Sequence, residues 1–262
     1  MIAPVSRNYG LEGLVTPLII GLAFLIESAA VASLLRQDFD YPVVLFFNRF
    51  AHRSVLWDYT MLAATRLALL QGVVLVAGIW LVWFDAPDPE TRARVAAGLI
   101  ASSFAGLVSR GLQLALPTHP RPIHDGSLSF TQPFGADPKV LNHWDSFPSD
   151  HASLLFGIAT IVTVVKPRVG IALFVWALIV SLGRVYTGFH FLSDITGGAG
   201  LGVVIVCISQ LSVFRDRCLV IARWARERPG PFYAAAFVAT FSTATMFDDV
   251  RAIGKGLAML RH

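Results

Sequence analysis

Apolar residues along this chain gather in long runs that short polar segments separate. Six runs reach about the 17 to 25 residues that a helix needs to cross the hydrocarbon core of a bilayer. They lie at 14–35, 61–84, 95–116, 149–165, 169–186 and 195–214. A further run at 232–247 is shorter and holds several Ser and Thr residues, so it fits a spanning helix and a helix lying flat equally well. The pattern predicts an all-α integral membrane bundle of six core transmembrane helices, with a seventh if the last run spans.

Composition supports the same class of protein. Hydrophobic residues make up 55% of the chain, charged residues 15%, and the mean hydropathy is +0.63, which is too apolar for an ordinary soluble domain. No Ser- or Gly-rich linker and no evident repeat divides the sequence, which indicates a single domain over 1–262. The two cysteines, Cys207 and Cys218, lack the number and placement of a disulfide framework.

The segment 38–59 differs from the predicted spans because it mixes aromatic and basic residues. Phe46, Phe47 and Phe50 stand close to Arg49 and Arg53. Such a mixture suits a helix that lies in the membrane interface rather than across it. We predict no chemistry for this segment.

Basic residues are distributed unevenly between the two sets of connecting segments. They gather before the first run, after the second, after the fourth and after the sixth, as Arg7, Arg92, Arg94, Lys166, Arg168, Arg215, Arg217, Arg223, Arg226 and Arg228. The positive-inside rule then predicts a cytoplasmic N-terminus and puts the opposite connections at the periplasmic face of a bacterial-type inner membrane. The same flanks account for the pI of about 9.4, so the basic charge does not indicate a nucleic-acid partner.

Polar residues that interrupt the apolar runs mark the candidate site, and the strongest group is Arg184, His190 and Asp194. An arginine at bilayer depth costs about 2.5 to 3.5 kcal/mol on insertion scales, so Arg184 is expected to face a polar cavity or a partner. In a helix, His190 and Asp194 stand one turn apart on one face. The carboxylate then accepts the proton of one ring nitrogen and leaves the other for chemistry. A helix-end histidine satisfied by a neighbouring acid is the alternative.

A second polar group, Ser149, Asp150 and His151, opens the fourth apolar run. An N-cap residue directly before an apolar run predicts a helix start, and the backbone N–H groups and dipole there favour an anion. His151 is expected to project from the first turn. Asp150 opposes anion binding unless its carboxylate turns away or serves a cation. The same residues also fit a simple helix cap.

The long polar connection at 118–150 supplies the third group. Connections of this length in compact proteins are usually functional or disordered, and this one holds Arg121 and His119 among several polar residues. Arg121 alone is weak evidence, because a loop arginine is usually solvated. Together with Arg184 it gives two guanidiniums beside two histidines and a helix N-terminus. Phosphoryl transfer needs such a set, since its transition state spreads negative charge over oxygens that donors must surround.

The three groups in this order resemble the three-part signature of the type 2 phosphatidic acid phosphatase superfamily. The matching residues are Arg121-Pro122, Pro148-Ser149-Asp150-His151, and Arg184 with His190 and Asp194, over about 112–198. The resemblance implies a membrane lipid phosphate phosphatase with a catalytic core at about 95–214 and a C-terminal extension at 215–262. It also implies neither a metal nor another cofactor, since the cationic donors supply the charge that a magnesium ion would bring.

The resemblance further implies a role for each matching residue. His190 would attack phosphorus to form a phosphohistidine, and Asp194 would orient its ring. His151 would protonate the leaving oxygen and later activate water. The residues expected at the phosphoryl oxygens are Arg121, Ser149 and Arg184, with Asp150 and His119 as further phosphate-binding candidates.

Three positions depart from the family pattern. The lysine that begins the family's first element falls at Leu114 here, and Arg110 and His119 are the candidates to replace it. Asp150 stands where the family usually has glycine, and Gly183 where it usually has serine. These changes leave both histidines and the carboxylate partner intact, so the sequence favours an active enzyme.

A site at the outer bilayer face, reached between apolar helices, suits a lipid phosphate whose tail stays in the membrane. An isoprenyl pyrophosphate, phosphatidic acid, phosphatidylglycerol phosphate and the phosphate of a lipid A type glycolipid all fit, and the sequence does not separate them. A lipid phosphotransferase using the same intermediate, a carrier, and a catalytically silent lipid-binding relative are the alternatives. The sequence indicates no oligomeric state.

Overall fold

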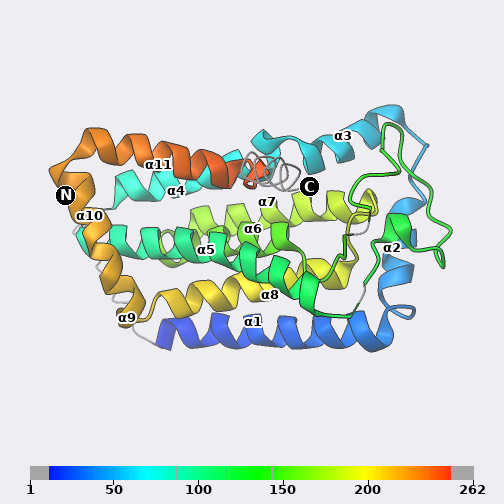
Figure 1. Cartoon of the computed structure of the whole chain (residues 1–262), viewed down its shortest axis with the longest axis horizontal. Helices are drawn as coiled ribbons and strands as arrows, with labels where there is room; N and C mark the ends of the chain where they lie inside the picture. Colours follow the sequence, from blue (N-terminus) through cyan, green and yellow to red (C-terminus); the bar gives the residue numbers. More distant parts are fainter. Residues whose placement is uncertain (1–11, 87, 118, 143, 249–262) are drawn as a thin grey trace, which may run out of the picture.

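The computed structural model describes residues 12–86, 88–117, 119–142 and 144–248, and every regular element in these ranges is a helix (Figure 1). The chain begins with α1 (Glu12–Ala30), its π-helical continuation η1 (Val31–Leu35), α2 (Asp40–Asn48) and α3 (Val55–Arg66). It continues with η2 (Leu69–Val73), α4 (Val74–Asp85), α5 (Pro89–Ala115) and a connecting segment, 116–149, that holds η3 (Pro122–His124). The remaining elements are α6 (Asp150–Val165), α7 (Pro167–Tyr186), α8 (Leu192–Ser209), α9 (Ser212–Arg215), η4 (Asp216–Cys218), α10 (Leu219–Glu227) and α11 (Pro229–Ala244).

Several helices are long and apolar enough to cross a membrane. These are α1 with η1, α5, α7 and α8, and the pair formed by α3 and the helix after it makes a fifth if it counts as one bent span. This confirms the predicted helical, multi-pass membrane protein. The helix α6 is apolar but has only 16 residues, so the count of six core spans stays a prediction.

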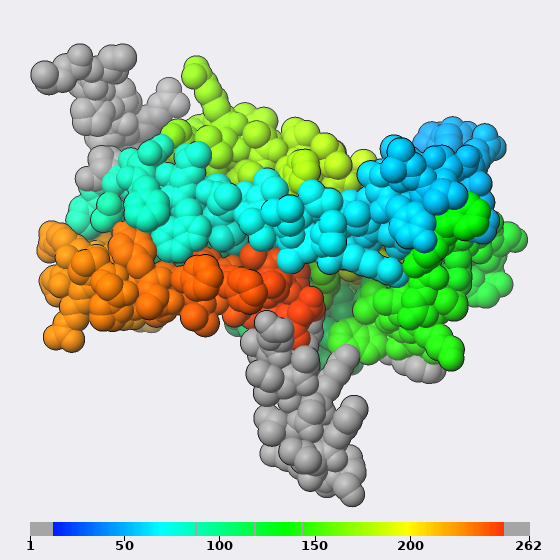
Figure 2. Space-filling model, turned by 90° about the horizontal axis from the view of Figure 1, so that it is seen from above, coloured from blue at the N-terminus to red at the C-terminus, as the bar shows by residue number. Residues whose placement is uncertain are grey.

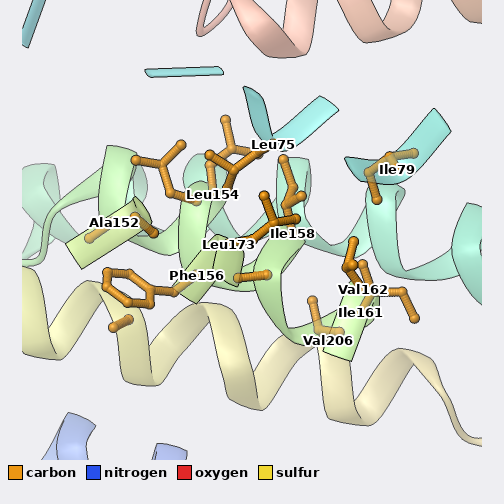
Figure 3. Close-up of a cluster of buried hydrophobic side chains, with 14 of the residues drawn as sticks. Leu75, Ile79, Ala152, Leu154, Phe156, Ile158, Ile161, Val162, Leu173 and Val206 are labelled. Carbon is orange, nitrogen blue, oxygen red and sulfur yellow. The ribbon is translucent and has the colours of Figure 1, made fainter. Parts of the chain in front are cut away.

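The centre of the bundle is α6, which packs against α4, α5, α7 and α8 (Figure 1). Its side chains are buried from Ala152 to Val162 without a break. Figure 3 shows them reaching toward Leu75 and Ile79 of α4 on one side and toward Val206 of α8 on the other. A helix surrounded in this way needs no polar face, which explains why its sequence is continuously apolar.

The second predicted span is wrong as a single helix. The run at 61–84 is predicted as one element, but the chain bends by 63° between α3 and the helix that runs from Leu69 to Asp85. The α3 helix ends because Leu67 adopts an extended conformation (φ −81°, ψ 115°). Beyond the bend, a Cβ atom at Gly72 would lie 2.1 Å from the carbonyl oxygen of Ala244, so the end of α11 rests directly on the backbone of η2. Hydropathy does not reveal this bend, because the chain is apolar on both sides of it.

The glycines of the sixth predicted span bring α8 against α6, because small residues let two helix backbones approach closely. A Cβ at Gly198 would lie 2.3 Å from the carbonyl oxygen of Ser149, and one at Gly202 would lie 2.2 Å from that of Ser153. Backbone-to-backbone packing of this kind fixes the start of α6 against the first turns of α8. The two polar groups predicted at these helix starts are therefore held together by the packing of the helices themselves.

The two ends of the bundle differ in the way that the charge pattern predicts. The start of α5 and the helices α9 and α10, with their arginines, lie at one end, whereas α2 and the connecting segment lie at the other (Figure 1). Arg7 lies outside the described residues. The apolar run at 232–247 forms α11, a helix of 16 residues that runs along α4 from the basic end toward the middle of the bundle.

We expect Gly202→Ala to lower the thermal midpoint of the detergent-solubilised protein. The new methyl group would collide with the backbone of α6, and overpacking of this kind typically costs about 1 to 3 kcal/mol. Gly111→Ala is the matched control, because nothing lies within 4 Å of the position where its Cβ would stand. That substitution should preserve or raise the midpoint, since alanine is favoured over glycine in a helix by about 0.5 to 1 kcal/mol. Equal midpoints for the two variants would contradict the close packing of α6 and α8.

Candidate active site

The three polar groups predicted from the sequence meet at the end of the bundle opposite α10. The turn between α7 and α8 carries His190, and it is shaped by Gly188, which adopts φ +72° and leaves no room for a Cβ because the Phe130 ring would lie 2.6 Å away. The N–H groups of Phe189 and His190 both donate to the carbonyl oxygen of Arg184, at 2.9 and 3.3 Å. This turn holds the imidazole at the junction of the two helices.

His190 is fully buried and contacts polar groups through both ring nitrogens. Its Nδ1 atom lies 3.3 Å from Asp194 Oδ2, and its Nε2 atom lies 3.2 Å from Arg121 Nη1 and 3.3 Å from Ser149 Oγ. A guanidinium only donates hydrogen bonds, so Nε2 is the acceptor of this pair and Nδ1 carries the proton that Asp194 accepts. Burial, followed by the nearby guanidiniums, lowers the pKa of His190 well below its usual value. The ring is neutral, with a lone pair on Nε2, which is the form that a nucleophilic imidazole requires.

Arg121 is held rigidly in the connecting segment. Its Nη1 atom donates to the carbonyl oxygen of Phe189 at 2.5 Å, and its Nε and Nη2 atoms donate to those of Trp144 and Asp145, both at 3.0 Å. Only 3% of the residue is exposed, and this burial lowers the pKa of its guanidinium. The carbonyl oxygens compensate the desolvation of the cation and fix its plane.

The second histidine has a carboxylate partner of its own. Asp150 Oδ1 accepts hydrogen bonds from the N–H of His151 at 2.9 Å and pairs with its Nδ1 atom at 3.0 Å. Ser149 caps α6, as the sequence predicts, by accepting from the N–H of Ala152 at 3.3 Å. The carboxylate of Asp150 therefore serves the imidazole of His151, which is a cation when it is protonated. A cationic partner is one of the two conditions given above under which Asp150 can stand beside a bound anion.

A cavity of about 630 Å³ lies beside these groups. Its lining includes Arg121, Asp150, His151 and Arg184, together with Thr65, Arg66, Ala68, Gln71, Lys139, Val140, Leu141, Asn142, Trp144, Phe189, Ala244, Thr245, Met246 and Asp248. Figure 2 shows the red end of α11 and the green connecting segment on either side of a hollow in this flank of the molecule. His190 is not part of the lining, because the Arg121 guanidinium and Ser149 contact the nitrogen that would face the cavity.

The sequence did not indicate several of the residues that line the cavity. No motif marks Arg66 or Lys139 as part of a site, and residues 244–248 reach the cavity only because α11 ends beside it. Within the described ranges, no group of three or more His, Cys, Asp or Glu residues is placed to hold a metal ion. Cys207 and Cys218 are both free thiols.

Comparison with known proteins agrees with this arrangement. Residues 92–218 of the chain match the family model of the PAP2 superfamily, and they include all three polar groups. The undecaprenyl-diphosphatase BcrC of Bacillus subtilis (strain 168) is 24% identical to this chain over 167 residues, which are 63% of this chain and 80% of that protein. The bacitracin transport permease protein BcrC of Bacillus licheniformis is 38% identical over 95 residues, which are 34% of this chain and 45% of that protein.

A solved structure has the same fold. It is the crystal structure of the first transmembrane PAP2 type phosphatidylglycerolphosphate phosphatase from Bacillus subtilis, with a TM-score of 0.51 and 23% sequence identity. The match covers 77% of this chain and 96% of that one. At this identity the similarity shows the fold alone.

The two candidates for the missing PAP2 lysine lie in different surroundings. Leu114, at the lysine position, is 75% exposed on α5. One turn earlier, the Arg110 guanidinium lies 3.7 Å from the ring centroid of Trp144, which lines the cavity. His119 is not among the lining residues; its Nδ1 atom lies 2.7 Å from Ser146 Oγ and 3.7 Å from Asp194 Oδ1. Arg110 is thus the cation nearer to the cavity lining, and His119 lies behind the carboxylate of the first histidine.

His119 gives the protein a pH-dependent stability term that can be measured. Burial, with a further contribution from Arg36, lowers the pKa of His119 to about 4 from its usual 6.5. As the pH falls below about 6.5, the unfolded chain binds a proton that the folded chain does not, so folding is disfavoured progressively down to about pH 4, by about 3 kcal/mol in total. We expect His119→Gln to lose less thermal stability than the wild type between these pH values. Parallel curves of thermal midpoint against pH would contradict a buried, neutral His119.

Proposed function

We propose that this protein hydrolyses a phosphomonoester or diphosphate on a membrane lipid through a phosphohistidine formed on His190. The observation that carries the proposal is the contact of the neutral His190 Nε2 atom with the Arg121 guanidinium, beside a cavity that His151 and Arg184 line. A second histidine and two guanidiniums that line one cavity, with a nucleophile directly behind the lining, are the groups that phosphoryl transfer requires.

In the proposed first step, the phosphoryl group of the lipid enters from the cavity, and one of its oxygens takes over the hydrogen bond that Arg121 Nη1 makes to Nε2, which frees the lone pair of Nε2. Nε2 attacks phosphorus, and the bond from phosphorus to the lipid oxygen breaks. The imidazole becomes positively charged as the P–N bond forms, and the carboxylate of Asp194 on its Nδ1–H stabilises that charge. Arg121, Arg184 and the Ser149 hydroxyl hold the phosphoryl oxygens, whose negative charge is spread in the transition state.

His151 completes the proposed cycle. Its protonated ring donates a proton to the departing lipid oxygen in the first step. The neutral ring then takes a proton from a water molecule that attacks the phosphohistidine, which releases inorganic phosphate and restores both histidines. The two histidines divide the roles of nucleophile and acid–base because each has its own carboxylate, Asp194 for His190 and Asp150 for His151.

We further propose that the site faces the periplasm of a bacterial inner membrane, with the N-terminus in the cytoplasm. This is supported by Arg92 and Arg94 at the start of α5 and by the arginines of α9 and α10, which lie at the end of the bundle away from the cavity (Figure 1). The names of the relatives favour an isoprenyl diphosphate or phosphatidylglycerol phosphate as substrate. An apolar surround with a polar cavity lets the lipid tail stay in the bilayer during the reaction.

Replacement of either histidine tests the proposal directly. We expect His190→Gln to release no measurable phosphate from isoprenyl diphosphate or phosphatidylglycerol phosphate, and His151→Gln to be slower than wild type by about 10²- to 10⁴-fold. After a pulse of labelled substrate, His151→Gln should retain an acid-labile phosphoenzyme that His190→Gln cannot form. His52→Gln is the control, because His52 is exposed and stacks on Phe134 outside the cavity lining. Turnover at the wild-type rate in His190→Gln would remove the proposed nucleophile.

Asp150 offers a separate test of the role of His151. A carboxylate beside an imidazole favours its protonated form, which is the form that donates to the leaving oxygen. We expect Asp150→Asn to move the alkaline limb of the pH–rate profile to lower pH, while the phosphoenzyme still forms. An unchanged alkaline limb would show that this carboxylate does not support the general acid.

A further inference from the structure

The cavity is lined by two cations for which the proposed mechanism has no role. Arg66, at the end of α3, and Lys139, in the connecting segment, line it together with Arg121 and Arg184. The exposure of the two pairs differs sharply: Arg121 and Arg184 are 3% and 4% exposed, whereas Arg66 and Lys139 are exposed. The buried pair therefore lies at the closed end of the cavity and the exposed pair at its mouth.

The mouth is built on fixed contacts. The side-chain amide of Asn48 on α2 donates to the carbonyl oxygen of Thr131 at 2.6 Å and accepts from its N–H at 2.8 Å. The N–H of Phe134 donates to Asp58 Oδ2 on α3 at 2.8 Å. These contacts hold the part of the connecting segment that precedes Lys139 against α2 and α3.

The two cations are joined through the same segment. Arg66 Nη1 donates to the carbonyl oxygen of Gly135 at 3.4 Å, four residues before Lys139. On the far side of Lys139, the carbonyl oxygen of Val140 lies 2.9 Å from Nε2 of His124. Because both flanks are anchored, the backbone of Lys139 is held at the same edge of the cavity as Arg66.

The groups at the closed end are enough for one phosphoryl group. Two guanidiniums, the Ser149 hydroxyl and the start of α6 offer the donors that the oxygens of a single phosphate need in a phosphoryl-transfer site. A cavity of about 630 Å³ is the size that accepts a whole head group. Its lining contains the four cations named above and the carboxylates of Asp150 and Asp248, and Asp150 pairs with His151. Asp248 is exposed like Arg66 and Lys139, so the mouth holds two cations and one carboxylate, and its net positive charge suits a second anionic group on the same lipid.

We infer that Arg66 and Lys139 bind the second phosphate of a lipid diphosphate, the one that stays on the lipid. This inference rests on the proposed function and narrows its substrate class to lipid diphosphates. Nε2 of His190 attacks the terminal phosphorus, the bond from that phosphorus to the bridging oxygen breaks, and the lipid monophosphate leaves with the electron pair. Arg66 and Lys139 stabilise the charge on that departing phosphate, and His151 supplies the proton.

The test compares a lipid diphosphate with the monophosphate of the same prenyl chain, in detergent micelles. We expect Arg66→Gln and Lys139→Gln each to raise KM for the diphosphate by about fivefold, and the double variant by tenfold or more, because hydrogen bonds between ionised groups are roughly twice as strong as neutral ones. The monophosphate makes only the contacts at the closed end. Its KM should therefore stay within about twofold of the wild-type value in these variants. Arg66→Lys and Lys139→Arg should restore the diphosphate KM, at least in part, because they keep the charge.

Arg53→Gln is the matched control: Arg53 is an exposed arginine that precedes α3 and faces the Phe50 ring rather than the cavity. Equal increases in KM for both substrates would overturn the inference, since they would show that Arg66 and Lys139 attract any anionic lipid by nonspecific electrostatics. Unchanged KM for the diphosphate would overturn it as well. If the wild type released phosphate from phosphatidylglycerol phosphate but from neither prenyl lipid, the inference alone would fail. If it released phosphate from none of the three lipids, the proposed function itself would fail, so the two failures are distinguishable.

Discussion

The contact between the Arg121 guanidinium and the Nε2 atom of His190 is the interaction on which the site depends. It requires a neutral imidazole with its proton on Nδ1, and therefore the carboxylate of Asp194 on the other side of the ring. It also requires a buried cation, which would be costly to desolvate without the carbonyl oxygens that surround it. Those carbonyls belong to two distant segments, the turn after α7 and the stretch around Trp144. The connecting segment must therefore fold over the helix ends before the two side chains can meet.

The helix packing supplies the other half of this constraint. Where α6 and α8 touch, the N–H of Ser149 donates to the backbone carbonyl of Asp194 at 2.9 Å, so the two helix starts are bonded to each other. The helix α2 fixes α8 from the outside: Asp40 accepts from the N–H and hydroxyl of Ser193, at 3.0 and 2.5 Å. Burial raises the pKa of Asp40, and the two donated hydrogen bonds partly oppose this shift. A segment for which the sequence predicted no chemistry thus positions the carboxylate beside the first histidine.

The sequence allowed prediction of the features that depend on local pattern. The apolar runs located α1, α5, α7 and α8, the Ser149 cap located the start of α6, and the three polar groups were correctly expected to meet. The sequence could not place residues whose position depends on packing between distant elements. His119 was a candidate at the phosphate by its closeness in sequence to Arg121, yet the fold of the connecting segment turns its ring toward Ser146, behind the site. Arg66 and Lys139 join the cavity only because the segment 131–135 is bonded to α2 and α3.

The bend after α3 cannot be predicted from hydropathy, yet it has a physical reason. Backbone that is not helical at membrane depth is tolerated only where protein covers it or where it lines a polar cavity, and this bend meets both conditions. Gln71 Nε2 donates to the carbonyl oxygen of Thr65 and Trp176 Nε1 to that of Leu70, both at 2.7 Å, so acceptors near the break are paired. Thr65, Ala68 and Gln71 line the cavity, and the end of α11 closes over the same stretch. The break therefore opens polar volume in the flank of an apolar bundle, and the proposed mechanism uses that volume to bring a charged head group to two histidines while the lipid tail remains in the bilayer.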